Sequence, residues 1–378
     1  MGASSQERSG QSLKILMTAD AVGGVWQYAV DLIRGLSLDG ASVLVATMGP
    51  RPSDDQKYQL LSIPDVTLAQ RDYALEWMPD PWCDVEAAGQ WLLDLANDFE
   101  PHLVHLNGYV HGSLPWNRPV AITAHSCVYS WWRAVHGCAP GEEWSEYKRR
   151  VLEGLTASDV IVAPSAYMAR AIEQEYGIET QRLKVIHNFN HAALRSEPAD
   201  KQNYVLAAGR IWDPAKNLSL LDEIASEVNW PIRLAGSERG PENSLAHPES
   251  LIPLGRLTHA GLLEQMEHAA IFAHPAFYEP FGLSVLEAAQ RQCCLVLSDI
   301  PSLRELWEGA AVFVDPHRPQ EWIEALNSLI ADPSRRQFMA RLASAHAARY
   351  RAADSIAAYR ELYGSLLNSK REKRNEAA

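Results

Sequence analysis

Short apolar runs alternate with helix-length amphipathic stretches along the first half of the chain. The apolar run 13–19 is followed by a helical pattern over 26–38 and by a second apolar run, 42–48. Apolar runs of this length that alternate with helices are typical of buried parallel strands, so the pattern predicts a doubly wound α/β domain. Further strands are predicted at four later runs: 102–106, 120–124, 159–163 and 183–186.

The alternation lapses over 191–202 and then begins again. Strands of a second sheet are predicted at 204–208, 231–235, 252–254, 270–273, 293–297 and 311–314, and helical patterns fill 320–330, 334–349 and 353–367. The chain is therefore predicted to form two doubly wound α/β domains, 13–195 and 203–350, with a hinge near residue 196 and a final helix over 351–367. The polar segment 1–12 predicts a disordered tail, and the charged end from Asn368 is expected to fray.

Composition excludes several classes of function. A length of 378 residues suits two domains, and 47% hydrophobic with 21% charged residues is typical of a globular protein. The net charge is −13 and neither half is basic, so no nucleic acid partner is expected. No apolar run is long enough to span a membrane, and residues 1–12 lack the apolar stretch of a signal peptide. The five cysteines have no metal-type spacing, and a reduced, cytoplasmic setting explains them most simply.

The densest candidate chemistry lies in the stretch 273–290. An apolar strand pattern leads into a turn rich in proline and aromatic residues, and a helix is predicted from about Ser284. Gly282 allows the backbone to come close to a ligand, and the amides of Leu283 and Ser284 should point out of the helix start. Free N–H groups and the helix dipole both attract anions there. This stretch therefore predicts a seat for a phosphorylated sugar.

Two carboxylates, Glu279 and Glu287, bracket the entry to that helix with seven residues between them. Together with the glycine turn and the helix start, they are candidates for part of that phosphorylated-sugar site. The alternative is structural, because Ser284 and Glu287 have the spacing of a capping box, in which each side chain satisfies a backbone donor of the other.

Arg210 and Lys216 flank a loop that directly follows a predicted strand of the second domain. Both side chains could reach one diphosphate, where negative charge grows as a sugar departs, and fixed cations would stabilise that transition state. Arginine can grip a phosphate through two parallel hydrogen bonds, whereas lysine acts as a point charge. In isolation the pair could equally be two exposed surface cations.

The first domain offers weaker signals. Gly23 and Gly24 directly follow the first strand, where ligands gather in an open sheet, but they do not match the Gly-x-Gly-x-x-Gly dinucleotide fingerprint. His125 lies at the mouth of the predicted sheet, where it could be functional or simply structural. Trp131 and Trp132, just beyond it, are candidates for the acceptor site, although most tryptophans in a tryptophan-rich region serve as core residues.

These motifs, in this order, resemble the retaining glycosyltransferases of family four, which have the GT-B fold, and the resemblance covers nearly all of 13–367. The segment from Glu279 to Glu287 resembles the paired-glutamate signature of that family, and the loop from Gly209 to Asn217 resembles its diphosphate-binding loop. The Gly-Gly-Val after the first strand lies where the family has its N-terminal phosphate loop. The loop near the nucleobase is matched by 254–257. The segment 185–190 departs from the family's usual Asn-Gly-Val-Asp.

The resemblance implies two Rossmann-like domains that face an interdomain cleft, with the acceptor bound by the first domain, the nucleotide sugar by the second, and the final helix crossing back to the first. Glu287 should then hold the donor ribose, and Glu279 should face the donor sugar. Arg210 and Lys216 should neutralise the diphosphate. The remaining donor-site expectations are closure of the first domain at Gly23 and Gly24, amides at Gly282, Leu283 and Ser284, a nucleobase loop at Arg256 and Leu257, and His125 against the sugar or the acceptor.

The implied reaction is transfer of a hexose from a nucleoside diphosphate sugar to an acceptor hydroxyl with retention of configuration. Donors such as UDP-glucose and GDP-mannose both fit, and the acceptor could be a sugar, a glycan, a lipid or a natural product. The sequence contains no Asp-x-Asp, so neither a metal ion nor a cofactor is expected. Two alternatives share the same fold: a sugar-nucleotide 2-epimerase, and a non-catalytic subunit that binds nucleotide sugars.

Overall fold

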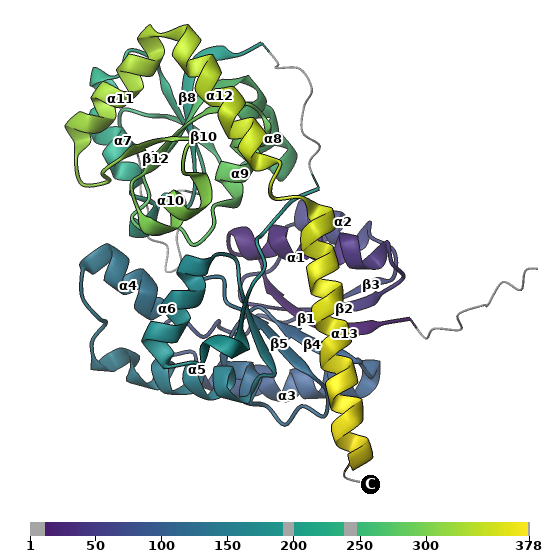
Figure 1. Cartoon of the computed structure of the whole chain (residues 1–378). Coiled ribbons are helices and arrows are strands. Elements are labelled where there is room, and N and C mark those ends of the chain that lie inside the picture. The colour runs from purple at the N-terminus through teal and green to yellow at the C-terminus, as the bar shows by residue number, and fades with distance from the viewer. Residues whose placement is uncertain (1–11, 192–199, 238–247, 377–378) are drawn as a thin grey trace, which may run out of the picture.

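The computed structural model describes residues 12–191, 200–237 and 248–376, which form two parallel sheets with helices on both faces of each (Figure 1). The strand order is β3-β2-β1-β4-β5-β6-β7 in the first sheet and β10-β9-β8-β11-β12-β13 in the second. Both orders reverse beside the first strand, between β1 and β4 and between β8 and β11. Ligands of such sheets bind where the order reverses. The two doubly wound sheets predicted from the sequence are confirmed.

The strands of the first sheet are β1 (Lys14–Asp20), β2 (Ser42–Met48), β3 (Val66–Gln70), β4 (Leu103–Leu106), β5 (Val120–Thr123), β6 (Val160–Ala163) and β7 (Leu183–Val185). The strands of the second are β8 (Gln202–Ala208), β9 (Ile232–Ala235), β10 (Ile252–Gly255), β11 (Ala269–His274), β12 (Cys294–Ser298) and β13 (Val312–Val314). The sequence did not predict β3, an edge strand that pairs only with β2 and is not fully buried at any position.

The α-helices of the first domain are α1 (Gly24–Ser37), α2 (Asp54–Leu61), α3 (Trp82–Phe99), α4 (Val128–His136), α5 (Ser145–Ala157) and α6 (Ala166–Tyr176). Those that follow are α7 (Leu218–Ile224), α8 (His259–His268), α9 (Leu283–Gln290), α10 (Pro301–Trp307), α11 (Pro319–Ala331), α12 (Pro333–Ala347) and α13 (Ala352–Glu376). Two short 3-10 helices border the site, η1 (Val110–Ser113) and η4 (Pro214–Lys216).

Three expectations concern the two chain ends and the hinge. The helix α13 continues to Glu376, so the fraying expected from Asn368 is wrong; the segment contains lysine, arginine and glutamate, which favour helix, and no proline or glycine. The hinge near residue 196 lies in 192–199, outside the described residues. The predicted tail 1–12 is also outside them except for Ser12, whose hydroxyl donates to the carbonyl oxygen of Gly40.

Each sheet has a core on both faces. In the first domain one face packs against α3, α5 and α6, and the other against α1 and α13. In the second domain α8, α9, α10 and α12 cover one face, and α7 and α11 cover the other. Both faces being covered explains why the strands read as continuous apolar runs in the sequence.

The last helix leaves the second domain and packs along the first (Figure 1), as the fold predicts. The Tyr359 hydroxyl lies 2.5 Å from that of Tyr28, and the Tyr363 hydroxyl lies 2.5 Å from Nδ1 of the buried His105. Gly35 in α1 allows this approach, because a Cβ there would overlap the side chain of Ile356. The helix therefore completes the first domain's core, and His105, inside the predicted strand 102–106, is a core residue.

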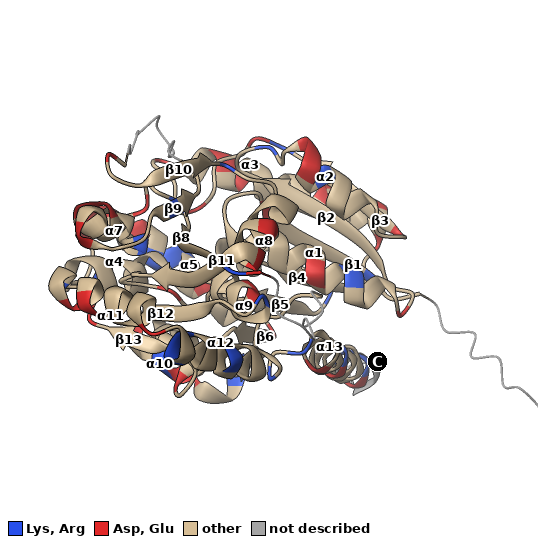
Figure 2. Ribbon diagram, turned by 90° about the horizontal axis from the view of Figure 1, so that it is seen from above, with Lys and Arg blue, Asp and Glu red and all other residues tan. Residues whose placement is uncertain are grey.

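Charges of both signs are mixed over the surface helices (Figure 2). On α5 the Lys148-Arg149-Arg150 cluster faces acidic partners: Arg149 pairs with Glu146 and Glu153, and Arg150 with Glu146 and Glu86. In the described part of the chain, none of the helices combines the length and the apolar character needed to cross a bilayer.

Candidate functional site

Arg210 emerges from the end of β8, at the point where the order of the second sheet reverses. Its Nη2 lies 2.5 Å from Oδ2 of Asp213, and the other oxygen of Asp213 accepts the amide of Ala215 at the start of η4. Burial disfavours the Asp213 anion, but the charges of Arg210 and Lys216 outweigh it and hold the pKa of that carboxyl below its usual value. Asp213 therefore stays ionised and fixes the guanidinium of Arg210.

Lys216, at the end of η4, reaches the segment between β11 and α9. Its Nζ lies 2.6 Å from Oε2 of Glu279, and the same oxygen lies 3.2 Å from Nε2 of His274. Burial again opposes ionisation, yet the charge of Lys216 and the hydrogen bond from His274 hold the pKa of Glu279 well below its usual value. Glu279 is therefore a fixed anion, with the ammonium group of Lys216 beside it.

The helix α9 begins at Leu283, one residue before the predicted start. Gly282 is its N-cap, with a φ of 86° that favours glycine, and no side chain caps the helix. The capping box between Ser284 and Glu287, considered as an alternative, is therefore wrong. The first amides of α9, those of Leu283 and Ser284 among them, have no partner within the helix, because the first turn of any helix leaves its donors free.

Glu287 faces α8 from the buried side of α9. Its Oε1 lies 2.7 Å from Nε2 of His259, the first residue of α8. Burial lowers the pKa of His259. The hydrogen bond to Glu287 and the charge of that carboxylate raise the pKa by more, so the net shift is upward. In the loop before α8, Leu257 packs on the core of the second domain, and Arg256 points toward Gln56 of the first domain, 3.5 Å away.

The glycine loop of the first domain lies directly against these residues. Gly23 has a φ of 82°, and a Cβ built on it would lie 2.5 Å from Nη1 of Arg210. A Cβ on Gly24 would contact Cδ1 of Leu283 at 3.6 Å. A side chain at position 23 would displace the guanidinium, so glycine is needed both for the backbone conformation and for the close approach. The structure thus brings the glycine loop, Arg210 and the start of α9 together.

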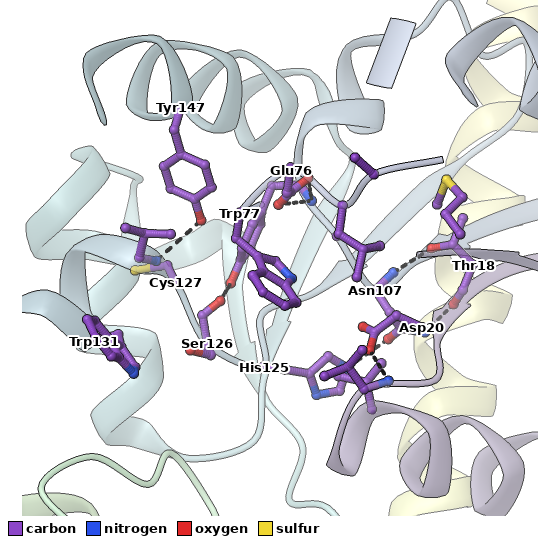
Figure 3. A pocket seen from close by; sticks show the side chains of 18 of the residues that line it. Thr18, Asp20, Glu76, Trp77, Asn107, His125, Ser126, Cys127, Trp131 and Tyr147 are labelled. Atoms are coloured by element: carbon purple, nitrogen blue, oxygen red, sulfur yellow. Dashed lines mark hydrogen bonds between the residues drawn. The ribbon is translucent and has the colours of Figure 1, made fainter. Parts of the chain in front are cut away.

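A cavity of about 460 Å³ extends from Arg210 into the first domain (Figure 3). The second domain contributes only the segment at Arg210, Trp212, Asp213 and Pro214. Aromatic side chains from several elements line the rest: Trp77, Tyr109, Trp131, Trp132, Trp144 and Tyr147. Its volume lies in the range of pockets that hold small molecules.

His125 follows β5 and lines this cavity. The Asn107 amide donates to the carbonyl oxygen of Thr18 at 2.6 Å, so the Asn107 oxygen must face Nε2 of His125, 2.8 Å away. Nε2 therefore carries the proton and Nδ1 carries the lone pair. Burial lowers the pKa of His125 to about 3, so the ring is neutral at physiological pH.

Two carboxyl groups lie in the same cavity. Asp20, at the end of β1, accepts the amide of Val22 at 2.8 Å, and burial raises its pKa to about 6. Glu76, on the loop after β3, accepts the amides of Tyr109 and Val110 at 3.1 Å, and burial raises its pKa to about 7. Both groups are acids whose charged forms are disfavoured by their surroundings.

The two tryptophans predicted for the acceptor site both line the cavity, in different ways. The indole N–H of Trp131 lies 3.2 Å from Oδ1 of Asp213, so this residue also ties the two domains together. Trp132 packs against His136, with ring centroids 4.6 Å apart, and against Trp144. Among the described residues, no group of three or more His, Cys, Asp and Glu side chains could hold a metal ion.

With this geometry established, the comparisons with known proteins are decisive. Residues 22–190 match the protein family described as Glycosyltransferase Family 4, and residues 192–346 match Glycosyl transferases group 1. The chain is a family-four glycosyltransferase. The resemblance drawn from its motifs is confirmed.

Curated relatives of this glycosyltransferase include D-inositol 3-phosphate glycosyltransferases. That of Segniliparus rotundus is 27% identical, with 88% of this chain and 82% of the relative covered. That of Nocardia farcinica is 26% identical over 70% of this chain and 66% of the relative. A third, from Paenarthrobacter aurescens, is 35% identical over 109 residues, which cover 27% of either chain.

Solved structures show the same GT-B arrangement at low sequence identity. A sucrose-phosphate synthase from Thermosynechococcus elongatus superposes with a TM-score of 0.78 at 18% identity, covering 94% of this chain and 100% of that chain. HepE of Anabaena, in complex with UDP and glucose, superposes with a TM-score of 0.69 at 17% identity, with the same coverage. The GT-B fold of this glycosyltransferase is therefore confirmed.

The sequence did not assign four polar residues that the structure places in the site: Asp20, Glu76, Asp213 and His274. Asp20 and His274 end the strands β1 and β11, one on each side of the cleft, and that position was the available signal. Asp213 lay inside the predicted diphosphate loop. Glu76 carried no signal, because it lies on a loop after the one strand that was not predicted.

Proposed function

We propose that this glycosyltransferase transfers a hexose from a nucleoside diphosphate sugar to an acceptor hydroxyl, with retention at the anomeric carbon and without a metal ion. The second domain would bind the donor and the first domain the acceptor. The observation that carries the proposal is the contact of Lys216 with Glu279, 2.6 Å, beside Arg210 and the open start of α9.

The donor end explains how the leaving group would be stabilised. As the bond from sugar to phosphate breaks, negative charge grows on the diphosphate, and Lys216, Arg210 and the first amides of α9 lie at one edge of the second sheet to meet it. Arg210 would exchange its bond to Asp213 for the diphosphate or share it between them. These cations take the place that a metal ion would otherwise fill.

The carboxylates fit different parts of the donor. Glu279 is held ionised by Lys216 and His274, and would accept hydrogen bonds from sugar hydroxyls. A carboxylate with a lowered pKa is a weak base and a weak nucleophile, which argues against a covalent intermediate on Glu279. Glu287, which sits deeper beside His259, would hold the ribose.

The base that takes the proton from the acceptor hydroxyl would be supplied by the donor itself. His125 lines the cavity but has a pKa of about 3, too low for efficient general base catalysis at neutral pH. The departing phosphate oxygen would therefore take the acceptor's proton as the hydroxyl attacks from the same face, and the configuration would be retained. His125 would contribute a hydrogen bond through Nδ1 to a substrate hydroxyl.

The cavity in the first domain favours transfer over the two alternatives. A 2-epimerase needs no second substrate, whereas about 460 Å³ of aromatic-lined space adjoins the donor residues here. A non-catalytic subunit would not need Lys216 and Glu279 held as an ion pair beside that space.

The test combines donor binding with product analysis. A thermal-shift screen of UDP, GDP and ADP and their glucose and mannose derivatives should reveal one stabilising base. Nucleoside diphosphate release with that donor should depend on an acceptor and persist in EDTA, and the product should show the donor's anomeric configuration by proton NMR. An isomeric nucleotide sugar formed without any acceptor would refute the proposal, and so would an inverted product.

A further inference from the structure

The part of the second domain that holds Arg210, Lys216, Glu279 and the start of α9 is called the donor edge below. The cavity in the first domain adjoins this edge but differs from it in charge. Asp20 and Glu76 line it, and Arg210 reaches its rim from the second domain. Arg210 is bonded to Asp213 and lies over Gly23, so its charge belongs to the donor edge. No other lysine or arginine stands among the described residues that line the cavity.

Both histidines in the lining are also uncharged. Burial lowers the pKa of His125 to about 3, and burial lowers the pKa of His111, whose Nε2 lies 3.0 Å from the carbonyl oxygen of Val85. Arg210 is therefore the one cation among the described residues of the lining, and it already serves Asp213 as a bonded partner and Asp20 as a nearby charge, so a buried acceptor phosphate would lack a cation of its own. Burying a phosphate without such a partner is strongly unfavourable.

The walls of the cavity are largely aromatic. Trp77, Trp131 and Tyr147 lie around it with the carboxyl groups (Figure 3). Aromatic faces of this kind bind planar apolar groups and the apolar faces of sugar rings. The polar groups are few and fixed, as in other small-molecule sites.

We propose that the acceptor is a small, non-anionic molecule with an aromatic or other flat apolar body, and that Glu76 and Asp20 exclude phosphorylated acceptors. This inference rests on the proposed function and names its second substrate. It separates this chain from relatives that are named for the acceptor D-inositol 3-phosphate. Exclusion by an unfavourable charge is a common means of specificity.

The two carboxyl groups cannot easily swing away from a bound ligand. Glu76 is held by the amides of Tyr109 and Val110, and a Cβ on Gly108 would lie only 3.3 Å from its Oε2. Asp20 is held by the amide of Val22. An acceptor phosphate in the cavity would therefore meet fixed acids. Above about pH 7, where both are mostly ionised, it would have to bind against their charge or with uptake of protons, at a cost in binding that grows with pH.

The test compares matched acceptors that differ by one phosphate. Phenyl β-D-glucopyranoside and its 6-phosphate are offered with the donor identified above, and kcat/KM is measured by nucleoside diphosphate release at a pH of about 8, where both carboxyl groups are mostly ionised. The neutral member should be preferred by at least about a hundredfold, the usual scale for a misplaced like charge. Equal rates, or a preference for the phosphate, would overturn the inference.

Direct binding covers the case in which neither compound is turned over. The cavity contains several tryptophans, so a bound aryl glycoside should change their fluorescence in the presence of the nucleoside diphosphate. Phenyl β-D-glucopyranoside should produce a saturable change that its 6-phosphate does not. A response to the phosphate alone, or to neither compound, would overturn the inference.

Two conservative variants test the role of the acids. Glu76→Gln and Asp20→Asn keep an oxygen for the backbone amides, and each should reduce the preference for the neutral acceptor about tenfold. Glu86→Gln is the matched control, since Glu86 is exposed on α3 and pairs with Arg150 outside the cavity. An unchanged preference in both test variants would refute the exclusion.

The measurements distinguish an error in the proposed function from an error in the inferred acceptor class. Stabilisation by the nucleoside diphosphate should be the same in wild type, Glu76→Gln and Glu86→Gln, because neither change touches the donor edge; Asp20→Asn is left out of this comparison, since the charge of Arg210 acts on Asp20. If wild type shows no donor binding, the proposed function is wrong. If donor binding is intact and the phosphorylated acceptor is preferred, only the acceptor class is wrong.

Discussion

The two domains differ in how the charge of their carboxyl groups near the cleft is balanced. At the end of β8 and β11, every carboxylate has a close basic partner: Asp213 with Arg210, and Glu279 with Lys216 and His274. At the end of β1 and on the loop after β3, Asp20 and Glu76 accept hydrogen bonds from backbone amides, and burial raises their pKa values to about 6 and about 7, although the charge of Arg210 opposes the shift at Asp20.

This contrast suggests a division of labour between the domains. Charges that are fixed and paired cost no reorganisation when a leaving group becomes more negative, which suits the donor side. Acids without a hydrogen-bonded cation, together with a neutral histidine, suit a space that must admit a hydroxyl and exclude anions. On the function proposed above, the second domain would carry the transfer chemistry and the first would select the acceptor.

Breaking the donor side should have the largest effect. In Lys216→Ala, kcat should fall about a thousandfold with every acceptor, because the ammonium group acts on charge that develops in the transition state. Steady-state kinetics of nucleoside diphosphate release would measure it. Lys184→Ala, on the exposed strand β7, is the control and should retain wild-type rates.

The same variant leaves Glu279 with His274 as its remaining partner, so its thermal unfolding midpoint should also fall. Adding Glu279→Gln should restore the midpoint without restoring turnover, which separates stability from catalysis. Wild-type activity in Lys216→Ala would contradict the assigned role.

On the acceptor side, the raised pKa of Glu76 should make the free energy of unfolding depend on pH. The unfolded chain releases the Glu76 proton near pH 4.5 and the folded protein near pH 7. The folded state therefore binds the extra proton in this window, and Glu76 reduces the free energy of unfolding as the pH rises, by about 3 kcal/mol in total.

Glu76→Gln removes that titration. Relative to wild type, the variant should gain on the order of 2–3 kcal/mol between pH 4.5 and pH 8, measured by urea unfolding at several pH values. Comparing the two proteins cancels the other titrating groups, the buried histidines among them. A constant difference across this range would show that Glu76 ionises normally in the folded protein.

Removing the hydrogen bond from Trp131 to Asp213, which joins the two domains, should have the smallest effect of these changes. Trp131→Phe keeps an aromatic face in the cavity but removes the indole N–H that donates to Asp213 at 3.2 Å. The KM for the acceptor should rise about tenfold, the scale of one hydrogen bond to a charged group, while thermal stabilisation by the nucleoside diphosphate is unchanged. Trp91→Phe, on α3 outside the cavity, serves as the control, and an equal rise there would remove the significance of the first result.

The donor side was largely predictable from the sequence because its residues lie in short contiguous motifs. Arg210 and Lys216 flank one loop, and Gly282, Leu283 and Glu279 lie within five residues of each other. A strand followed by a glycine turn and a helix start has few possible geometries, so the local pattern implied the spatial one. Continuous apolar runs made every described strand except β3 predictable from the sequence.

The acceptor side could not be predicted in the same way. Asp20, Glu76 and His125 come from three distant segments, and only the strand order β1-β4-β5 and the loop after β3 bring them to one cavity. The strand β3 was itself missed, since partial exposure interrupts its apolar run. A single acid on a loop carries no pattern, and its raised pKa depends on burial by residues far away in the chain.

The place of α13 has a consequence for synthesis of the protein on the ribosome. Ile356, Tyr359 and Tyr363 belong to the core of the first of the two domains, so that domain keeps an open apolar face until α13 has been translated, after the whole second sheet. The second sheet, whose strands all lie within 202–314, can close earlier. The part of the enzyme that is made first is thus the last to mature, and a chain that stops short of Tyr359 would present that face to chaperones and proteases.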